Sequence, residues 1–570
     1  MGEGEWNRGV RKLLTGGRVS PNVRLGVEIH LELRALARRE AGCRRVLGRL
    51  ARRFLLRTAH HRLGFTRIDD YARERLGISG RELQELARVE RALEALPLIA
   101  EAFDVGELSW SHVRVLASVA TPETEREWLL RGRGATVRGL ASMARKPLPD
   151  DDALDGEETS WVSIGCPRHV RRLWTEAVEL ASRMEGARIP AWRAAEAVAA
   201  EGLALGVSAE VASPPVTCAP PSLPEAARWE PGTERLPEDV KRLAAPWIVD
   251  PHQLDAHLRM ALAMLQSMDW ETGRLLAEVS SRRLHQQIGI ARFADYVRER
   301  LGMSLRRARA LIALDRAARR HETFGEAYRT GRLSMARALV ILPVLHEATA
   351  AAWIARAQEV TIRRLSDSVA WALEATEVGE PVMPPPAEGA LTLPDAPEVQ
   401  TCARPLAAEV RFRAPQSVAA LFRGAVRVCT KPGEPPWMGL ERLLRHARAE
   451  WLAQPRHRDP IFERDGWRCA VPACGARASL HDHHIVYRSR GGANAWMNRV
   501  SICAAHHLRG IHGMRIRVEG IAPDDLTWEL GLRRPHPPLM RTHGDRYLEP
   551  FTAGLDTLES RRSNAMPLAS

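Results

Sequence analysis

The stretch "DYARERLGIS", from Asp70 to Ser79, returns with two substitutions as "DYVRERLGMS", from Asp295 to Ser304. The same offset of 225 residues aligns the later segments "FDVGELSWSHVRVL" and "YRTGRLSMARALVI", and it pairs Trp128 with Trp353. Self-similarity maintained over such a length is the sequence signature of a repeated structural unit. The chain therefore contains one module twice.

Within each copy, apolar residues recur at the spacing of one helix face. Gly77 and Gly302 are expected to end one helix, and Ser79 and Ser304 to cap the next. Short strands are expected just before Cys166 and Ala414, in "SWVSIG" and "EVRFR". The predicted fold class is mainly α, with two copies of a helical module followed by a small metal-bound domain. The apolar positions are Leu83, Leu86, Val89, Leu93 and Leu96 in the first copy and Leu311, Leu314 and Ala318 in the second.

The segment "RERLGISGREL" has the form of a helix-turn-helix, with a glycine-centred turn and a serine-capped second helix. Together with the following "GELSWSH", it resembles the DNA-binding region of ParB-type partition proteins. That resemblance implies DNA binding by the helical copies. A helical scaffold or a dimerisation role is the alternative interpretation.

Proline-rich stretches divide the chain. One of them, "SPPVTCAPPSLPEAARWEPGTERLPEDV", separates the copies, and another lies inside the second copy. The predicted divisions are helical copy one at 22–205, a linker at 206–247, helical copy two at 248–453 with an internal linker at 378–405, a catalytic domain at 454–520, and a partly disordered tail at 521–570.

The formal net charge of +13 and the pI of about 9.9 favour a polyanionic partner such as DNA. Because 79 of the 83 basic residues are arginine, the composition of a G+C-rich genome is the alternative explanation. The chain has no apolar run of 18 residues and no secretory signal at its start, so we expect a cytoplasmic protein without a membrane partner. Eight scattered cysteines do not resemble a disulfide framework.

Near the C-terminus, cysteine and histidine concentrate at the spacing of metal ligands. Cys469 and Cys474 form a C-x4-C pair, and Cys503 and His506 form a C-x2-H pair. Four such ligands can close a tetrahedral structural zinc site, and bound Zn²⁺ would supply much of the folding free energy of a segment this short.

Another set of residues in the same segment is not explained by zinc. His484, Asn498 and His507 lie 14 and then nine residues apart. With the His483–His484–Ile485 start, the "RSRGGAN" loop and the Cys-x2-His-His end, they resemble the HNH endonuclease family, which has a ββα-metal fold. The resemblance covers about 60 of the 570 residues.

The resemblance implies a role for each matched residue. His484 corresponds to the general base and Asn498 to the asparagine that orients its loop. His483 and His507 correspond to ligands of a catalytic divalent ion, which would be Mg²⁺ or another ion such as Mn²⁺, Co²⁺ or Ni²⁺. Many relatives have Asp at the position of His483, C-x2-C in place of C-x4-C, and Cys in place of His506. An imidazole ligand favours Mn²⁺, Co²⁺ or Ni²⁺ over Mg²⁺.

Three neighbouring residues have open assignments. His512 could contact phosphate or the metal, or lie at the surface. His481 and Asp482 are expected to support the ligands or to face solvent, and Asp482 could replace His483 as a ligand if the turn is shifted by one residue. Five arginines are candidate phosphate contacts, with a solvated basic face as the alternative: Arg464, Arg468, Arg488, Arg490 and Arg499.

The resemblance implies a metal-dependent HNH endonuclease that hydrolyses DNA phosphodiester bonds. One centre holds one hydrolytic ion, so each subunit is expected to nick, and a double-strand break would require a homodimer. A zinc-stabilised DNA-binding protein without catalysis is the main alternative. An interaction scaffold built from the helical copies is another.

Overall fold

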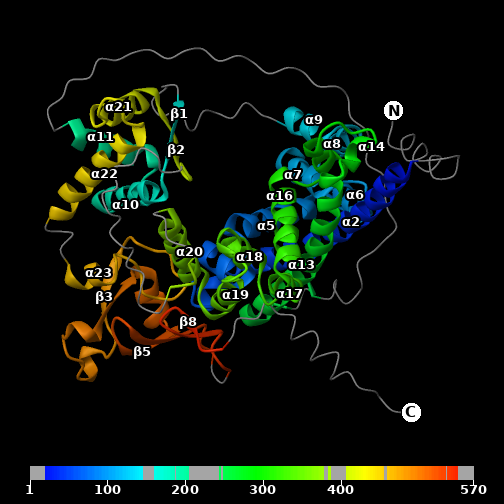
Figure 1. The fold of residues 1–570 in the computed structure, drawn as a ribbon. Helices are drawn as coiled ribbons and strands as arrows, with labels where there is room; N and C mark the ends of the chain where they lie inside the picture. Colours follow the sequence, from blue (N-terminus) through cyan, green and yellow to red (C-terminus); the bar gives the residue numbers. More distant parts are fainter. Residues whose placement is uncertain are drawn as a thin grey trace, which may run out of the picture.

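The computed structural model describes residues 20–144, 159–186, 188–203, 243–245, 248–377, 383–386, 406–454, 459–533 and 536–549 (Figure 1). Most of these residues are helical, which confirms the mainly α prediction. Within these ranges, no helix combines the length and apolarity needed to cross a membrane. Most of the predicted linkers at 206–247 and 378–405 lies outside the described residues.

The first copy is built from a long helix followed by shorter ones. Its elements are α2 (Pro21–Leu56), α3 (Ala59–Arg62), α4 (Ile68–Tyr71), η1 (Ala72–Leu76), α5 (Gly80–Ala95), α6 (Pro97–Asp104), α7 (Trp110–Val119), α8 (Glu125–Gly134), α9 (Val137–Met143), β1 (Thr159–Cys166), α10 (Arg168–Met184) and α11 (Ala191–Leu203).

The second copy follows the same order. Its elements are α13 (Pro251–Ser281), α14 (Leu284–Gln287), α15 (Phe293–Asp295), η3 (Tyr296–Arg300), α16 (Leu305–Arg320), α17 (Glu322–Arg329), α18 (Met335–Ile341), η4 (Leu342–Val344), α19 (Ala350–Glu359), α20 (Ile362–Glu377), β2 (Ala408–Pro415), α21 (Gln416–Val428) and α22 (Pro436–Ala453). The predicted caps are confirmed in both copies, because Ser79 Oγ accepts a hydrogen bond from Glu82 N and Ser304 Oγ accepts one from Arg307 N.

The copies pack against each other through equivalent surfaces. The turn at Gly77, with a φ of +67°, lies against Ser334 of the second copy, and the turn at Gly302 lies against Ser109 of the first. A Cβ at Gly77 would lie 2.7 Å from Ser334 Cβ, so this approach requires glycine. The turns of the helix-turn-helix pattern therefore pack between the copies, which are related by an approximate twofold axis.

The two short strands confirm this symmetry. β1 and β2 pair antiparallel, with Ser163 opposite Arg411. These strands and helices α10, α11, α21 and α22 enclose one apolar core, in which Trp174 stacks on Phe412 at a ring distance of 5.1 Å. Strands from both copies are therefore needed to complete this part of the fold.

The C-terminal part contains most of the β structure. Its elements are α23 (Pro460–Arg464), β3 (Leu480–His484), η6 (Arg488–Arg490), η7 (Trp496–Asn498), β4 (Arg499–Cys503), η8 (His506–Ile511), β5 (Ile516–Ile521), β6 (Asp525–Leu530), β7 (Met540–His543) and β8 (Arg546–Tyr547). β3 and β4 form an antiparallel hairpin that the helical segment η8 follows, and β5 to β8 form a second antiparallel sheet.

This sheet differs from the sequence-based boundary at residue 520. The boundary falls inside β5, and ordered strands continue to Tyr547 where a partly disordered tail was predicted. Leu526, Trp528 and Leu530 alternate along β6 and are buried in the same apolar core as Cys469. That alternation is the sequence signal for a half-buried strand. Residues 550–570 of the predicted tail lie outside the described residues.

Candidate metal centres

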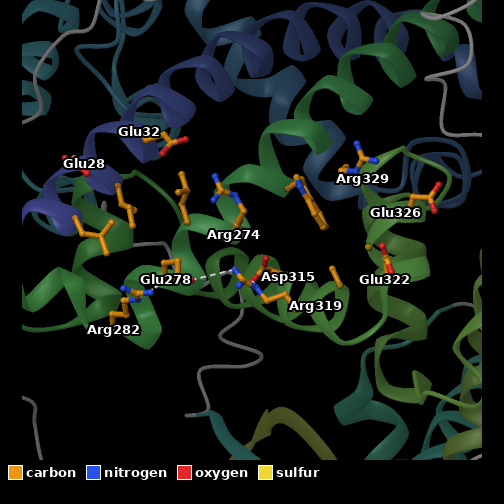
Figure 2. Close-up of a pocket in the computed structure, with 16 residues that line it drawn as sticks. Glu28, Glu32, Arg274, Glu278, Arg282, Asp315, Arg319, Glu322, Glu326 and Arg329 are labelled. Carbon is orange, nitrogen blue, oxygen red and sulfur yellow. Dashed lines mark hydrogen bonds and ion pairs between the residues drawn. The ribbon is translucent and has the colours of Figure 1, made fainter. Parts of the chain in front are cut away.

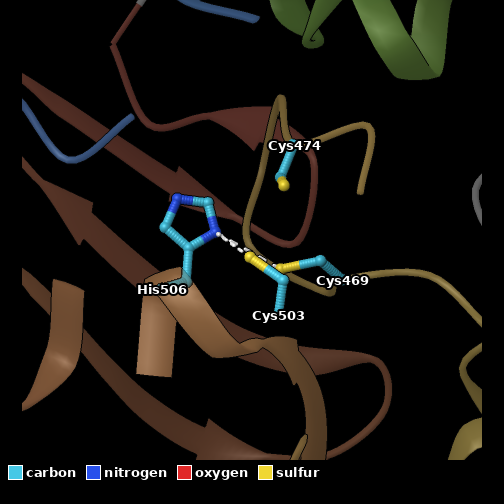
Figure 3. A group of neighbouring side chains, drawn as sticks. All are labelled: Cys469, Cys474, Cys503 and His506. Carbon is cyan, nitrogen blue, oxygen red and sulfur yellow. Dashed lines mark hydrogen bonds between the residues drawn. The ribbon is translucent and has the colours of Figure 1, made fainter. Parts of the chain in front are cut away.

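Four side chains form a buried cluster that could hold a metal ion such as zinc (Figure 3). The ligand atoms of Cys469, Cys474, Cys503 and His506 all lie within 4.8 Å of one another, and all four residues are buried. His506 Nδ1 lies 3.4 Å from the sulfurs of both Cys469 and Cys503. Three thiolates and one imidazole form a donor set that zinc prefers.

The electrostatics of the cluster also suit a cation. Burial raises the pKa of the Cys469 thiol well above its usual range. Hydrogen bonds from Cys469 and then from Cys474 lower the pKa of Cys503. Without a cation the three thiols could not all be ionised together in a buried space, so the thiolate form of this set requires a positive partner.

Both helical copies contact the residues that form this cluster or lie next to it. In the first copy, the carbonyl of Gly64 lies 3.0 Å from His506 Nε2, and Asp70 Oδ2 accepts a hydrogen bond from Gly475 N at 3.3 Å. A hydrogen bond to the second nitrogen of a ligating histidine fixes the orientation of the ring. The first copy therefore holds His506 with its Nδ1 facing the sulfurs.

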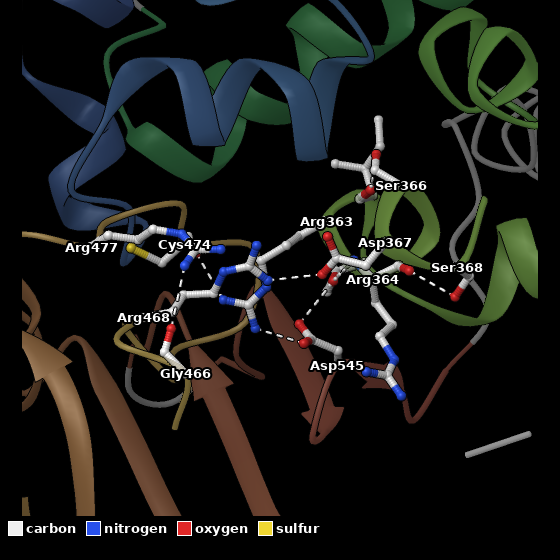
Figure 4. A network of polar contacts seen from close by, with 12 residues as sticks. Arg363, Arg364, Ser366, Asp367, Ser368, Gly466, Arg468, Cys474, Arg477 and Asp545 are labelled. Atoms are coloured by element: carbon white, nitrogen blue, oxygen red, sulfur yellow. Dashed lines mark hydrogen bonds and ion pairs between the residues drawn. The ribbon is translucent and has the colours of Figure 1, made fainter. Parts of the chain in front are cut away.

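The second copy contributes Arg363 from α20 (Figure 4). Its Nη1 donates to the carbonyls of Cys469 at 3.0 Å, Val471 at 3.3 Å and Cys474 at 2.8 Å. Its Nη2 pairs with Asp545, just before β8, at 2.6 Å. One guanidinium thus joins α20, the cysteine loop and the C-terminal sheet.

A second cluster contains His483, His507 and His512, whose ligand nitrogens also lie within 4.8 Å of one another. His483 comes from β3, and His507 lies in η8 with His512 directly after it. Burial, followed by the neighbouring His507, lowers the pKa of His483 to about 4. At neutral pH this imidazole is uncharged, so it can offer a lone pair to a metal ion.

His481 lies beside the second cluster, a placement that its sequence position could have predicted. Residues i and i+2 of a strand share one face, and His481 and His483 both lie in β3. His481 Nδ1 lies 2.9 Å from His507 Nδ1. Asp482 projects to the other face and pairs with Arg499, so the structure places His483 and not Asp482 in the cluster.

His484 and Asn498 lie at the loop that joins β3 to β4. Asn498 Oδ1 accepts from Val486 N at 2.8 Å, and its Nδ2 donates to the carbonyls of Val486 at 3.0 Å and Ala493 at 2.8 Å. His484 Nε2 lies 3.0 Å from Oδ1 of Asn494, the last residue of the "RSRGGAN" loop, for which the sequence predicted no separate role. His484 is not one of the three clustered histidines.

The five candidate phosphate-binding arginines divide into two groups. Arg464 pairs with Asp465 at 2.7 Å, Arg468 pairs with Asp367 at 2.8 Å, and Arg499 pairs with Asp482. Arg488 and Arg490 lie exposed in η6 on the loop after His484. Within the described part of the chain, the guanidiniums of these two arginines form no ion pair.

Comparison with known proteins identifies no relative: no family model, no curated protein and no solved structure matches this chain.

Proposed function

We propose that this chain is a metal-dependent endonuclease of the HNH type, with a ββα-metal fold at β3, β4 and η8, that hydrolyses phosphodiester bonds of DNA. The observation that supports the proposal is the three-histidine cluster beside a loop that Asn498 holds and that presents His484. A histidine cluster alone would suit many metal sites. The adjoining base and asparagine are what favour hydrolysis.

In this proposal His483, His507 and His512 are the protein ligands of one divalent ion. Bound there, the ion would polarise a phosphoryl oxygen and lower the pKa of a coordinated water. His481 contacts Nδ1 of His507 and so leaves the Nε2 of His507 for the ion. His512, for which phosphate contact was one expectation, is assigned to the metal because it lies 3.2 Å from His507, Nε2 to Nε2.

His484 acts as the general base. With its Nε2–H donating to Asn494 Oδ1, the ring keeps Nδ1 unprotonated and able to accept a proton. The water that loses this proton attacks phosphorus, and the bond from phosphorus to the 3′ oxygen breaks. The leaving oxygen then takes a proton from solvent. Asn498 keeps the backbone of Val486 and Ala493 in place, so it positions the base without touching the substrate.

Arg488 and Arg490 are the proposed phosphate contacts, because both are exposed on the loop that follows the base. Arg464, Arg468 and Arg499 are instead engaged in ion pairs within the protein. If the exposed pair neutralises two phosphates, its loss should reduce the salt dependence of DNA binding by about two in log–log slope.

The test is cleavage of supercoiled plasmid by the purified protein with Mg²⁺, Mn²⁺, Co²⁺ or Ni²⁺ added in turn. We expect nicking that is stronger with Mn²⁺, Co²⁺ or Ni²⁺ than with Mg²⁺, since imidazole ligands favour those ions. His484→Ala should abolish it while keeping its zinc content, and His346→Ala, at an exposed position in the second copy, should cleave as the unmodified chain does.

Two other results would lead to different conclusions. Salt-sensitive plasmid binding without cleavage by any ion would favour the alternative of a zinc-stabilised DNA-binding protein. Linearisation at a concentration where only monomer exists would contradict nicking by a single centre and remove the reason to expect a homodimer.

A further inference from the structure

The twofold symmetry of the helical body makes one difference between the copies visible. In the first copy, residues 243–245 and Ile248, which directly precede α13, pack in a groove beside the C-terminal end of α2. Arg53 donates hydrogen bonds to the carbonyls of Ala244, Ala245 and Ile248, and His257 Nδ1 lies 2.9 Å from the carbonyl of Leu243. This groove is filled by the chain that leads into the next long helix.

The equivalent groove of the second copy is open (Figure 2). It has a volume of about 1000 Å³ and lies between α2, α13, α16 and α17. The offset of 225 residues relates Arg53 to Glu278 and His257 to Glu32, and both glutamates line the open groove. The same place in the fold is therefore empty among the described residues of the second copy.

The two grooves differ in the sign of their polar groups. Where Arg53 and His257 meet backbone carbonyls in the first copy, the second copy presents the carboxylates of Glu278 and Glu32. Six carboxylates line the open groove against four guanidiniums, in a chain whose net charge is +13. The carboxylates are Glu28, Glu32, Glu278, Asp315, Glu322 and Glu326. Glu278 and Asp315 pair with Arg282 and Arg319 within the groove. The remaining excess of carboxylates favours an occupant that carries positive charge.

Apolar side chains complete the groove. Leu25 and Ile29 of α2 and Leu275 of α13 line it, together with Trp270. Acidic groups beside an apolar surface fit a segment with apolar and basic residues, and they do not fit a simple cation.

We propose that residues 1–19 of this chain, which directly precede α2, dock in this groove. Trp6, Val10, Leu13 and Leu14 recur at the spacing of one helix face. Four basic residues accompany them against two acids, Glu3 and Glu5, which gives the positive charge that the groove favours. The bases are Arg8, Arg11, Lys12 and Arg18.

The connection between segment and groove is short. α2 begins at Pro21, and the lining of the groove begins one turn later at Leu25. An extended chain of this length could reach about 60 Å, so the 19 residues can return along α2 to α17. The residues before α13 fill the groove of the first copy, and the residues before α2 would fill that of the second. In the second groove the basic residues would belong to the segment and the acidic residues to the groove.

A carbodiimide cross-link on the full chain tests the proposal. The chain has only four lysines, Lys12, Lys146, Lys241 and Lys431, so a link from Lys12 to a carboxylate can be assigned by mass spectrometry without ambiguity. We expect Lys12 to link to groove carboxylates such as Glu32, Glu322 or Glu326, and the yield to fall at least tenfold at 1 M salt, where charges are screened beyond about 3 Å. Links from Lys12 only to carboxylates outside the groove would overturn the proposal, and so would no link at all.

A matched pair of variants separates docking from chance proximity. Glu32→Lys with Glu326→Lys should lower protection from hydrogen exchange in α17 to the level of a chain lacking residues 1–19. Glu101→Lys, at the position in the first copy that corresponds to Glu326, should leave it unchanged. Equal protection in all these proteins would overturn the proposal.

Mixing ¹⁵N-labelled and unlabelled chains before cross-linking identifies which chain supplies the segment. Cross-links between a labelled and an unlabelled peptide would show that a second copy supplies it, and would overturn docking within one chain.

Discussion

Gly64 and Gly289 occupy equivalent turns, and both have a φ of +84°. Gly64 is buried because the C-terminal sheet covers it, and its carbonyl contacts His506. Gly289 is exposed, and a Cβ there would meet nothing within 4 Å. The residues around the two turns are also alike, since Asp70 and Glu74 of the first copy correspond to Asp295 and Glu299 of the second.

The comparison shows that equivalent residues of the two copies can have different contacts. Glu74 is fully buried between Arg337, at 2.6 Å, and Tyr547 of β8. Both glutamates accept a hydrogen bond from an equivalent backbone amide, Glu74 from Ile362 N and Glu299 from Val137 N, each at 2.9 Å. Glu299 nevertheless stays partly exposed. The same local sequence therefore contacts the C-terminal sheet in one copy, whereas in the other it contacts only the helical body and stays partly exposed.

Loss of the cysteine cluster should have the largest effect on this difference. In Cys503→Ser, a structural ion would lose one of four ligands, and small metal-held segments generally unfold without their ion. We expect hydrogen exchange around Gly64 to accelerate at least tenfold, which is about 1.4 kcal/mol of lost protection, while exchange around Gly289 stays constant. The control is Cys429→Ser, because Cys429 is partly buried against the core formed by β1, β2 and their helices, away from the cluster. Unchanged exchange at Gly64 would show that docking does not depend on the cluster.

Replacement of the two equivalent glutamates should also affect the two copies unequally. Glu74→Ala leaves Arg337 buried with one charge partner fewer, which costs about 3 to 5 kcal/mol. Glu299→Ala removes one hydrogen bond to a backbone amide and should cost about 1 kcal/mol. Urea unfolding followed by circular dichroism measures both free energies. Equal losses would contradict this difference between the contacts of Glu74 and Glu299.

The two glycines provide a smaller and more local test. Alanine at either position must adopt a positive φ, which costs about 1 to 2 kcal/mol. At Gly64 the added Cβ would also lie 3.1 Å from Gly531 N and 3.3 Å from Leu530 Cβ, and overpacking adds about 1 to 3 kcal/mol. Gly64→Ala should therefore unfold at lower urea than Gly289→Ala. The reverse order would mean that the sheet does not rest on Gly64.

His30 and Asp255 are equivalent residues whose contributions to stability should depend differently on pH. Burial, followed by Arg34, lowers the pKa of His30 to about 3, below its unfolded value of about 6.5. Between these values only the unfolded chain binds the proton, so stability falls as pH decreases through this window, by up to about 1.4 kcal/mol per unit. His30→Asn should flatten the slope between pH 6.5 and 4, as thermal unfolding would show.

Asp255 should act in a more acidic window. Burial acts to raise its pKa, but the Arg75 guanidinium, 2.8 Å away, outweighs burial and holds the pKa below the usual value. Its contribution is present above about pH 4 and is lost only below that pH. Asp255→Asn should therefore leave the slope between pH 6.5 and 4 unchanged. A flattened slope there would show that the two positions titrate together.

Features set by neighbouring residues could be predicted from the sequence. The serine caps depend on a hydrogen bond over three residues. The C-x4-C and C-x2-H pairs indicated the cysteine cluster because each pair lies within one turn of chain. The catalytic roles of His484 and Asn498 stay predictions, although the structure places both residues at one loop.

Features that join distant parts of the chain could not be predicted in this way. The contact between His506 and Gly64 spans 442 positions, and Arg363 reaches the carbonyl of Cys474 across 111. No local pattern indicates such a pairing, because only packing decides it. The strands beyond residue 520, unlike these contacts, could have been predicted, because the alternation of Leu526, Trp528 and Leu530 is a local sequence pattern.

The ladder between β1 and β2 has a consequence for how the protein is made. Ser163 of β1 and Glu409 of β2 are hydrogen-bonded although they lie 246 positions apart. A ribosome adds about 5 to 20 residues per second, so β1 waits roughly 12 to 50 s after its own synthesis before its partner exists. During that interval the nascent chain carries an unpaired strand edge that can associate with other strands. The core around β1 and β2 can therefore form only after the second copy has been synthesised as far as α22.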